Sequence, residues 1–236
     1  MKRAIAAAGA VRWVLLFSGL AALGYCGYIY ADTAVYQRYQ NWAFDEQLQG
    51  RKPNVRAFLA DTTPLRGLLQ RAAHSSERPD VNSTAPSPVQ QAEERALIGR
   101  IEIPRLKVQA IVREGDDDGT LRRAVGHIPS SPLPGHAGNV ALAGHRDTFF
   151  RGLRAVRKND KINIRTLAGD YEYVVENLRV VSPDDVQVLA PTAANVLTLV
   201  TCYPFNYVGN APKRYIVRAR QVVTAKALAA SASSTP

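Results

Sequence analysis

Hydrophobic and polar residues alternate through much of the segment from residue 96 to residue 222, a pattern typical of half-buried β-strands. The alternating stretches are separated by turn residues, among them Ala168-Gly169-Asp170, which indicate a hairpin. Short helices are expected at 120–125 and 150–156. The number of short strands in about 125 residues predicts a mostly β domain, either a compact barrel or a sandwich. The expected strands are 97–114 (interrupted near Pro104), 139–145, 161–167, 171–181, 195–202 and 214–223.

A long apolar segment lies near the start of the chain. The 19 residues from Trp13 to Ala31 carry no charge, enough to cross a bilayer as a helix. The apolar region of a cleaved signal peptide is shorter, roughly 7–15 residues. Basic residues precede the segment and Asp32 follows it, so we expect residues 1–31 to be a cytoplasmic N-terminus and a single-pass transmembrane signal anchor. Three tyrosines crowd its outer end, where interfacial aromatic residues are common: Tyr25, Tyr28 and Tyr30.

A polar region separates the apolar segment from the strand-rich domain. Residues 33–50 lack proline and place apolar side chains at helical spacing, which predicts a stalk helix that continues the membrane segment or docks against the domain. Residues 74–91 are nearly free of large apolar side chains and cannot bury enough surface to fold alone. We therefore expect a stalk helix and flexible linker at 32–95, the folded domain at 96–222 and a disordered tail at 223–236.

The composition indicates a folded protein with a positive charge. Hydrophobic residues make up 46% of the chain and charged residues 21%, so the chain is not wholly disordered. A formal net charge of +10 would suit nucleic acid, yet no helix carries a basic cluster and no nucleic-acid motif is present. We expect no nucleic-acid partner, since work beside anionic lipid or cell-wall polymer explains the sign of the charge equally well.

Strand alternation also assigns residues of three stretches to shared faces. If these faces adjoin, they form a groove on the outer wall of the barrel, with small side chains on its floor. A thiol, an imidazole and a guanidinium would then lie at one end of a groove that fits an extended peptide. The members are Ala141, Ala143 and His145 on one stretch, Thr198, Val200 and Cys202 on another, and Arg214 on the final one.

The three groups at the end of this groove can perform acyl transfer. Cys202 lies far from Cys26 of the apolar segment, so it is an unpaired thiol in an exported domain. A thiolate attacks a carbonyl carbon, an imidazolium protonates the departing amine, and a guanidinium stabilises the oxyanion or fixes the peptide. His145 and Arg214 are the candidates for the last two roles. The alternative is a buried, inert cysteine that packs as a small hydrophobic residue.

Three short segments resemble the sortases, the cysteine transpeptidases that attach proteins to bacterial cell envelopes. Residues 198–202, TLVTC, are similar to the TLxTC signature of that family. Residues 142–147, LAGHRD, resemble the segment that carries its histidine, and 213–217, KRYIV, resemble the final strand, which begins with its arginine. The order and the separations also agree over roughly residues 96–222. The connection of 11 residues between the cysteine and the arginine is similar to that of class D-like sortases.

The resemblance implies a closed eight-stranded β-barrel in which Cys202 is the nucleophile, His145 the acid/base and Arg214 the oxyanion or substrate-positioning group. It implies cleavage of a C-terminal sorting signal of secreted proteins, of LPxTG type or a variant, through a thioester on Cys202. The acyl group would pass to an amine of a peptidoglycan precursor or of a pilin lysine, and no cofactor is implied. Candidate substrate-binding residues are Ala143, Thr198, Val200, Thr201, Tyr203 and Tyr207.

Several alternatives share some of these features. A thiol endopeptidase would use the same three residues and release the acyl group to water, and a non-catalytic module would only bind envelope peptides. The L,D-transpeptidases need a cysteine in a Gly/Ser-rich motif, which TLVTCYP does not supply. Ordinary packing at the barrel rim is an equal alternative for the aromatic residues that follow Cys202. Lipidation of Cys26 is disfavoured because the bulky Tyr25 precedes it.

Metal sites are also disfavoured by spacing. His127, His136 and His145 lie nine residues apart and match neither compact zinc pattern, so no metal is expected. The three aspartates before Gly119 are expected to form a solvated turn rather than a calcium site. His127 is expected to be a loop or rim histidine, and Asp147 to bond to nearby backbone.

Overall fold

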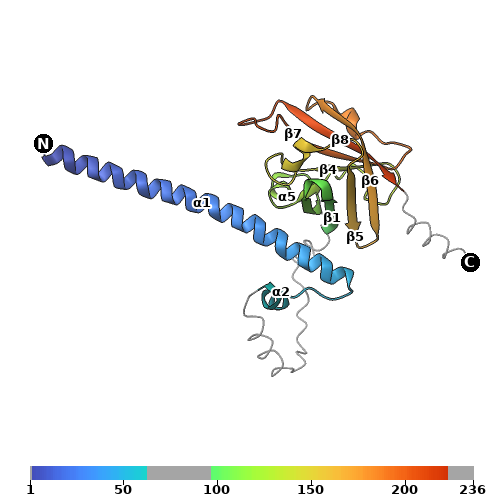
Figure 1. Cartoon of the computed structure of the whole chain (residues 1–236), viewed down its shortest axis with the longest axis horizontal. Helices are drawn as coiled ribbons and strands as arrows, with labels where there is room; N and C mark the ends of the chain where they lie inside the picture. The colour runs from blue at the N-terminus through green and yellow to red at the C-terminus, as the bar shows by residue number, and fades with distance from the viewer. Residues whose placement is uncertain (1, 63–96, 223–236) are drawn as a thin grey trace, which may run out of the picture.

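The computed structural model describes residues 2–62 and 97–222. The linker expected at 74–91 and the tail expected at 223–236 lie outside the described residues. Within them, a long N-terminal helix is followed by a short helix and then by a β-barrel (Figure 1).

The apolar segment and the stalk form one uninterrupted helix, α1 (Lys2–Leu48). The helix ends where Gly50 adopts a left-handed conformation with φ of +72°. The N–H of Gly50 donates to the carbonyl of Gln47 at 2.9 Å, and the N–H of Arg51 donates to that of Glu46 at 2.9 Å. This pair of hydrogen bonds is the Schellman motif, which satisfies the last carbonyls of a helix and favours glycine. A second helix, α2 (Val55–Thr62), follows directly.

Eight strands close into a barrel in the order β1-β2-β3-β4-β7-β8-β6-β5, which confirms the expected fold. The pairs β2–β3 and β4–β7 are parallel and the others antiparallel. Strand β3 has only three residues and is absent from the strands expected from the sequence. The strands are β1 (Leu97–Ile103), β2 (Val108–Glu114), β3 (Val125–His127), β4 (Asn139–Ala143), β5 (Lys161–Thr166), β6 (Asp170–Val181), β7 (Val196–Tyr203) and β8 (Lys213–Val222).

Short helices fill the connections of the barrel, two of them close to the positions expected from the sequence. Helix α5 (Asp118–Arg123) begins at Asp117, whose carboxylate accepts hydrogen bonds from the backbone N–H groups of Gly119 and Thr120. The aspartate run is therefore a helix start, as Asp is a favoured N-cap residue. The remaining short helices are η1 (Pro104–Leu106), η2 (Arg151–Ala155) and η3 (Val186–Leu189).

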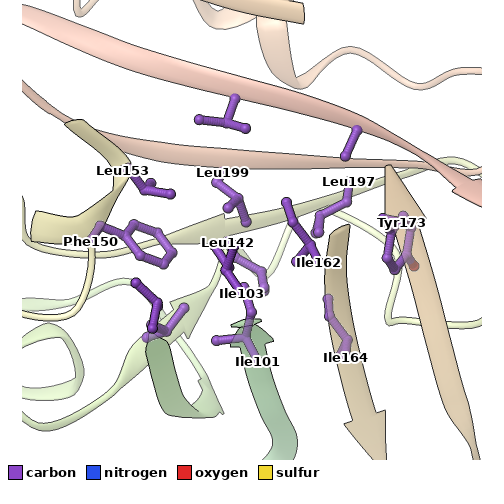
Figure 2. Close-up of a cluster of buried hydrophobic side chains, with 14 of the residues drawn as sticks. Ile101, Ile103, Leu142, Phe150, Leu153, Ile162, Ile164, Tyr173, Leu197 and Leu199 are labelled. Carbon is purple, nitrogen blue, oxygen red and sulfur yellow. The ribbon is translucent and has the colours of Figure 1, made fainter. Parts of the chain in front are cut away.

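The barrel interior is filled by aliphatic side chains from alternate positions of its strands (Figure 2). Leu197 and Leu199 of β7 and Leu142 of β4 have no accessible surface and point inward. Because side chains on a strand alternate between faces, the residues between them must face outward. Phe150, which precedes η2, is also fully buried in this core. The core thus fixes which residues of β4 and β7 can reach a ligand.

The C-terminal half of α1 docks against the barrel, beside β2 and α5 (Figure 1). Phe44 is fully buried there, and the Arg100 guanidinium of β1 lies 5.4 Å from the centre of its ring. The same guanidinium makes an ion pair of 2.9 Å with Asp45. Gln37 accepts a hydrogen bond of 3.1 Å from the backbone N–H of Ile111, on β2. The stalk helix therefore both continues the apolar segment and docks on the domain.

The N-terminal half of α1 projects away from the barrel (Figure 1). Its apolar side chains are exposed, including Trp13 at 54%, Phe17 at 64% and Leu23 at 72%. By length and composition, α1 is a candidate membrane span, and it is the sole such helix in the part of the chain that the structure describes.

Candidate active site

Three neighbouring strands bring the predicted catalytic residues to one end of the barrel. Strands β4, β7 and β8 are adjacent, and Cys202 of β7 lies directly opposite Arg214 of β8 in their antiparallel register. Ala143 of β4 pairs with Val200 of β7, and His145 and Cys202 each follow two residues later. Residues opposite one another in an antiparallel pair have Cα atoms about 4.5–5.5 Å apart. All three catalytic candidates are half-buried, and the sulfur is not sealed in the core.

The segment that carries His145 is fastened to β7 through Gly144. The backbone N–H of Gly144 donates to the carbonyl of Val200 at 3.1 Å, and the hydroxyl of Thr201 donates to the carbonyl of Gly144 at 2.7 Å. A β-carbon on Gly144 would lie 2.7 Å from Cδ2 of Phe150, a contact that real side chains do not make. Position 144 therefore requires glycine, because the Phe150 ring is buried and has no space to retreat.

Arg146 joins the His145 segment to the β7–β8 connection. Its Nη2 donates to the carbonyls of Tyr207 at 2.7 Å and Gly209 at 3.0 Å. The backbone carbonyl of His145 also accepts a hydrogen bond of 3.1 Å from the N–H of Phe150, which closes the turn. Sequence reasoning did not single out Arg146. Its partners lie 61 and 63 residues further along the chain, so no local pattern reports the contact.

Arg214 is held by the backbone of the same connection. Its Nη1 donates to the carbonyl of Ala211 at 3.2 Å and to that of Lys213 at 3.1 Å. Among the described residues, no hydrogen-bond partner is recorded for its Nε or Nη2. A guanidinium presents five N–H donors in a planar fork. Two of its nitrogens therefore keep donors free for a ligand beside Cys202.

The outer face of β4 and β7 offers less accessible surface than the sequence predicts. Ala143 and Val200 are half-buried on the outer face, as expected. Thr198 faces outward but has no accessible surface, and its hydroxyl donates to Oδ1 of Asn139 at 2.7 Å. The amide of Asn139 in turn donates to carbonyls of the β6–β7 connection, which covers this end of the strands.

Thr201 also lies away from the predicted groove. It lies on the inward face of β7, 2% exposed, with its hydroxyl on the Gly144 carbonyl. Thr201 therefore has almost no surface to offer a peptide in this structure. Thr198 is itself fully buried but lines a pocket of about 110 Å³ together with Ile216 and Arg218. That either residue contacts substrate stays a prediction. The alternation of β7 already puts Thr201 on the face opposite Cys202.

Some of the aromatic residues around Cys202 pack against one another, and one is exposed to solvent. Tyr203, Phe205 and Tyr215 form a cluster with ring centres 5.4–6.0 Å apart at the end of the core. Burial, followed by the proximity of Tyr203, raises the pKa of Tyr215 above its usual value. Tyr207 is 46% exposed and free to meet a ligand. Tyr203 and Phe205 therefore match the rim-packing alternative, and Tyr207 remains available.

His127 makes contacts typical of a structural residue. His127, expected in a loop or at the rim, lies on β3 and is 2% exposed. Its Nδ1 lies 2.8 Å from a Glu114 carboxylate oxygen, and its Nε2 lies 3.0 Å from the Ser131 hydroxyl and 3.1 Å from the Pro132 carbonyl. Within residues 2–62 and 97–222, no group of His, Cys, Asp and Glu is arranged to hold a metal ion.

Comparison with known proteins identifies the family. Residues 101–222 match the family model described as the sortase domain. Sortase D of Bacillus subtilis (strain 168) is 33% identical over 174 residues, which are 70% of this chain and 88% of that protein. A solved Clostridium perfringens Sortase D5 transpeptidase is 30% identical, with a TM-score of 0.50 over 54% of this chain and 79% of that chain. The structure of C. perfringens sortase C with the C-terminal cell wall sorting motif gives 26% identity and a TM-score of 0.51, over 55% and 72%. The chain therefore belongs to the sortase family, with class D-like relatives.

Proposed function

We propose that the chain is a cysteine transpeptidase that cleaves a C-terminal sorting signal of LPxTG type and transfers the acyl fragment to an amine. The observation that carries the proposal is the strand register, in which Cys202 lies opposite Arg214 and beside the segment of His145. Membership of a family of cysteine transpeptidases supports the same reaction. These three residues are the proposed catalytic residues.

The proposed reaction has two acyl-transfer steps. The Cys202 thiolate attacks the carbonyl carbon of the scissile peptide bond, and donors of Arg214 stabilise the oxyanion that forms. The His145 imidazolium gives its proton to the departing amine, and a thioester remains on Cys202. An incoming amine then attacks the thioester and loses a proton to the neutral imidazole. The new amide forms as the thiolate leaves, so the enzyme returns to its initial charge state.

The proposed peptide site is the outer groove beside Cys202. Ala143 and Val200 form a floor of small side chains, over which an extended peptide can lie without a steric clash. Exposed Tyr207 is the proposed wall on the side of the β7–β8 connection, and Arg146 holds that connection in place. Tyr203 would act on the site only through packing.

The proposed placement is an N-terminus in the cytoplasm, one membrane span within α1, and a barrel on the extracytoplasmic side. Basic residues before the apolar segment favour this orientation. The proposed donors are secreted proteins with a C-terminal sorting signal, and the proposed acceptor is an amine of a peptidoglycan precursor or a pilin lysine. The C. perfringens sortase C structure is one with the C-terminal cell wall sorting motif, which supports this class of donor.

Mass spectrometry of the full chain with sorting-signal peptides tests the nucleophile. We expect an acyl adduct on Cys202 that is absent from the Cys202→Ala variant. The matched control is Cys26→Ala, which removes the other cysteine and leaves the adduct intact. An adduct that persists in Cys202→Ala, or that forms on another residue, would end the nucleophile assignment.

Added amines separate transfer from hydrolysis. With oligoglycine or an envelope amine present, we expect a ligated product in place of the free acid. Hydrolysis alone with every amine would make the protein a thiol endopeptidase instead. The rate should be bell-shaped in pH, because the thiolate and the imidazolium must be present together. A rate that rises without limit with pH would argue against this pair.

A further inference from the structure

A cleft of about 1060 Å³ lies between α1 and the barrel and reaches His145. We call it the juxtamembrane cleft. On one side it is lined by the segment of α1 from Tyr25 to Gln37. On the other side its walls come from η1, the start of β2, α5, η2 and the turn after His145. His145, the proposed acid/base, therefore borders this cleft in addition to the proposed peptide site.

The walls of the juxtamembrane cleft are positively charged. Five basic and two acidic residues line it, an excess of three positive charges (5 − 2). One basic residue, Arg123, makes an ion pair of 3.4 Å with Asp32. The other four are exposed, and no carboxylate partner is recorded for them among the described residues. They are Lys107, Arg122, Arg151 and Arg154.

The helix side of the cleft lies where the apolar segment ends. Tyr25, Tyr28 and Tyr30 line it and are 65%, 68% and 81% exposed. Tyrosines at this position of a span mark the level of the lipid headgroups. The headgroup region adds roughly 5–7 Å to each side of the hydrocarbon core, about four residues of helix. Asp32, the first residue after the apolar segment, pairs with Arg123, so Arg123 lies at headgroup level, and the other four basic residues line the same cleft.

We propose that the juxtamembrane cleft binds the phosphate groups of anionic phospholipids, and that this contact holds the His145 side of the active site against the membrane surface. The inference rests on the proposed membrane span and on the extracytoplasmic placement of the barrel. Guanidinium groups suit phosphate because their planar fork donates two parallel hydrogen bonds. Charge attraction to an anionic bilayer acts only within about a Debye length, so cations at headgroup level gain most.

Hydrogen exchange of the full chain in lipid nanodiscs tests this proposal. The bilayer is phosphatidylcholine alone, or phosphatidylcholine mixed with phosphatidylglycerol. We expect the backbone amides of 118–124 and 150–156 to exchange at least about three times more slowly in the bilayer with phosphatidylglycerol than in phosphatidylcholine alone. The reason is that bound headgroups restrict local opening. The test variant is Arg151→Glu/Arg154→Glu, which should lose this protection. The control variant is Arg179→Glu/Arg220→Glu, which makes the same charge change on exposed positions of β6 and β8 and should keep it.

Three results would overturn the proposal. The first is equal exchange in both bilayers. The second is protection that survives Arg151→Glu/Arg154→Glu. The third is an equal loss of protection in the control variant, which would show that the protection depends only on the net charge of the barrel. A chain that leaves the bilayer on alkaline extraction would also overturn it, because the cleft would then have no headgroups beside it. Adduct formation on Cys202 with a soluble peptide is measured on every variant. It reports correct folding and tests the proposed catalysis separately, since it does not require anionic lipid.

Discussion

Replacing Thr201 with Val removes one hydrogen bond next to the proposed catalytic histidine. The Thr201 hydroxyl donates to the Gly144 carbonyl at 2.7 Å, and its side chain is 2% exposed. Val keeps the branched shape but cannot donate, so the Gly144 carbonyl loses a buried partner. A net hydrogen bond contributes about 0.5–1.5 kcal/mol, and an unpaired buried carbonyl costs about 1–3 kcal/mol. We expect the free energy of unfolding to fall by about 1–2 kcal/mol.

The same change should lower the rate by more than the stability loss explains. Gly144 directly precedes His145, so a looser Gly144 displaces the imidazole relative to Cys202. A displacement of about 1 Å at a reacting group can cost roughly 10²-fold in rate, and we expect a 10- to 100-fold fall. Urea denaturation measures the stability, and the initial rate of adduct formation with a sorting-signal peptide measures the chemistry.

Thr198→Val is the matched control. Thr198 lies on the same strand, is fully buried, and donates a hydrogen bond of the same 2.7 Å length, but to Asn139. We expect a similar stability loss, with a rate within a few-fold of the parent. Equal rate losses in the two variants would refute the argument that the Thr201 bond positions His145. So would a Thr201→Val enzyme that is destabilised but retains the parental rate.

Three further changes probe the neighbouring contacts. Gly144→Ala should lower both stability, by about 1–3 kcal/mol, and activity, because its β-carbon meets the buried Phe150 ring at 2.7 Å; unfolding and peptide cleavage measure the two losses. Arg146→Ala should raise KM for the peptide more than it lowers kcat, because the β7–β8 connection loses two hydrogen bonds. Asp160→Asn should lower the free energy of unfolding at pH 7 by about 1–2 kcal/mol, because the carboxylate is 6% exposed and accepts Nη2–H of Arg105 at 2.6 Å.

The pH dependence of the last variant has a definite sign. The hydrogen bond from Arg105 lowers the pKa of Asp160 below its ordinary value of 3.8. A depressed pKa in the folded state means stabilisation that is full at neutral pH and is lost as the pH falls below about 4. The difference between parent and variant should therefore shrink in acid, and a constant difference would contradict the assignment.

Gly169→Ala is the control for Gly144→Ala, since its β-carbon would meet only Tyr171 at an ordinary 3.5 Å.

The fold was predictable from alternation because most strands are long enough to display it. Strand β3 was not, because three residues with Gly126 at the centre carry no period. The pairing of β3 with β2 also explains why His127 is a buried strand residue and not the loop or rim histidine expected from the sequence. The register places it opposite Glu114. Such long-range pairing leaves no trace in the local pattern.

In the candidate site, too, the strand period predicted the placement of some residues and not of others. The order and faces of His145, Cys202 and Arg214 followed from strand period and from the family motif. The family resemblance predicts a substrate contact for Thr201, although the period of β7 directs its side chain inward. Thr198 faces outward as expected, but it is covered by the β6–β7 connection, a tertiary contact that the sequence does not report.

The unbroken α1 has a geometric consequence for any substrate. From Asp32 to Leu48 the helix rises about 25 Å, and the barrel is fastened along this length rather than suspended beyond it. With α1 as the proposed membrane span, the barrel is held at a fixed height above the bilayer. On the proposed function, a substrate held in the membrane would be cleaved only if its own spacer presents the scissile bond at that height.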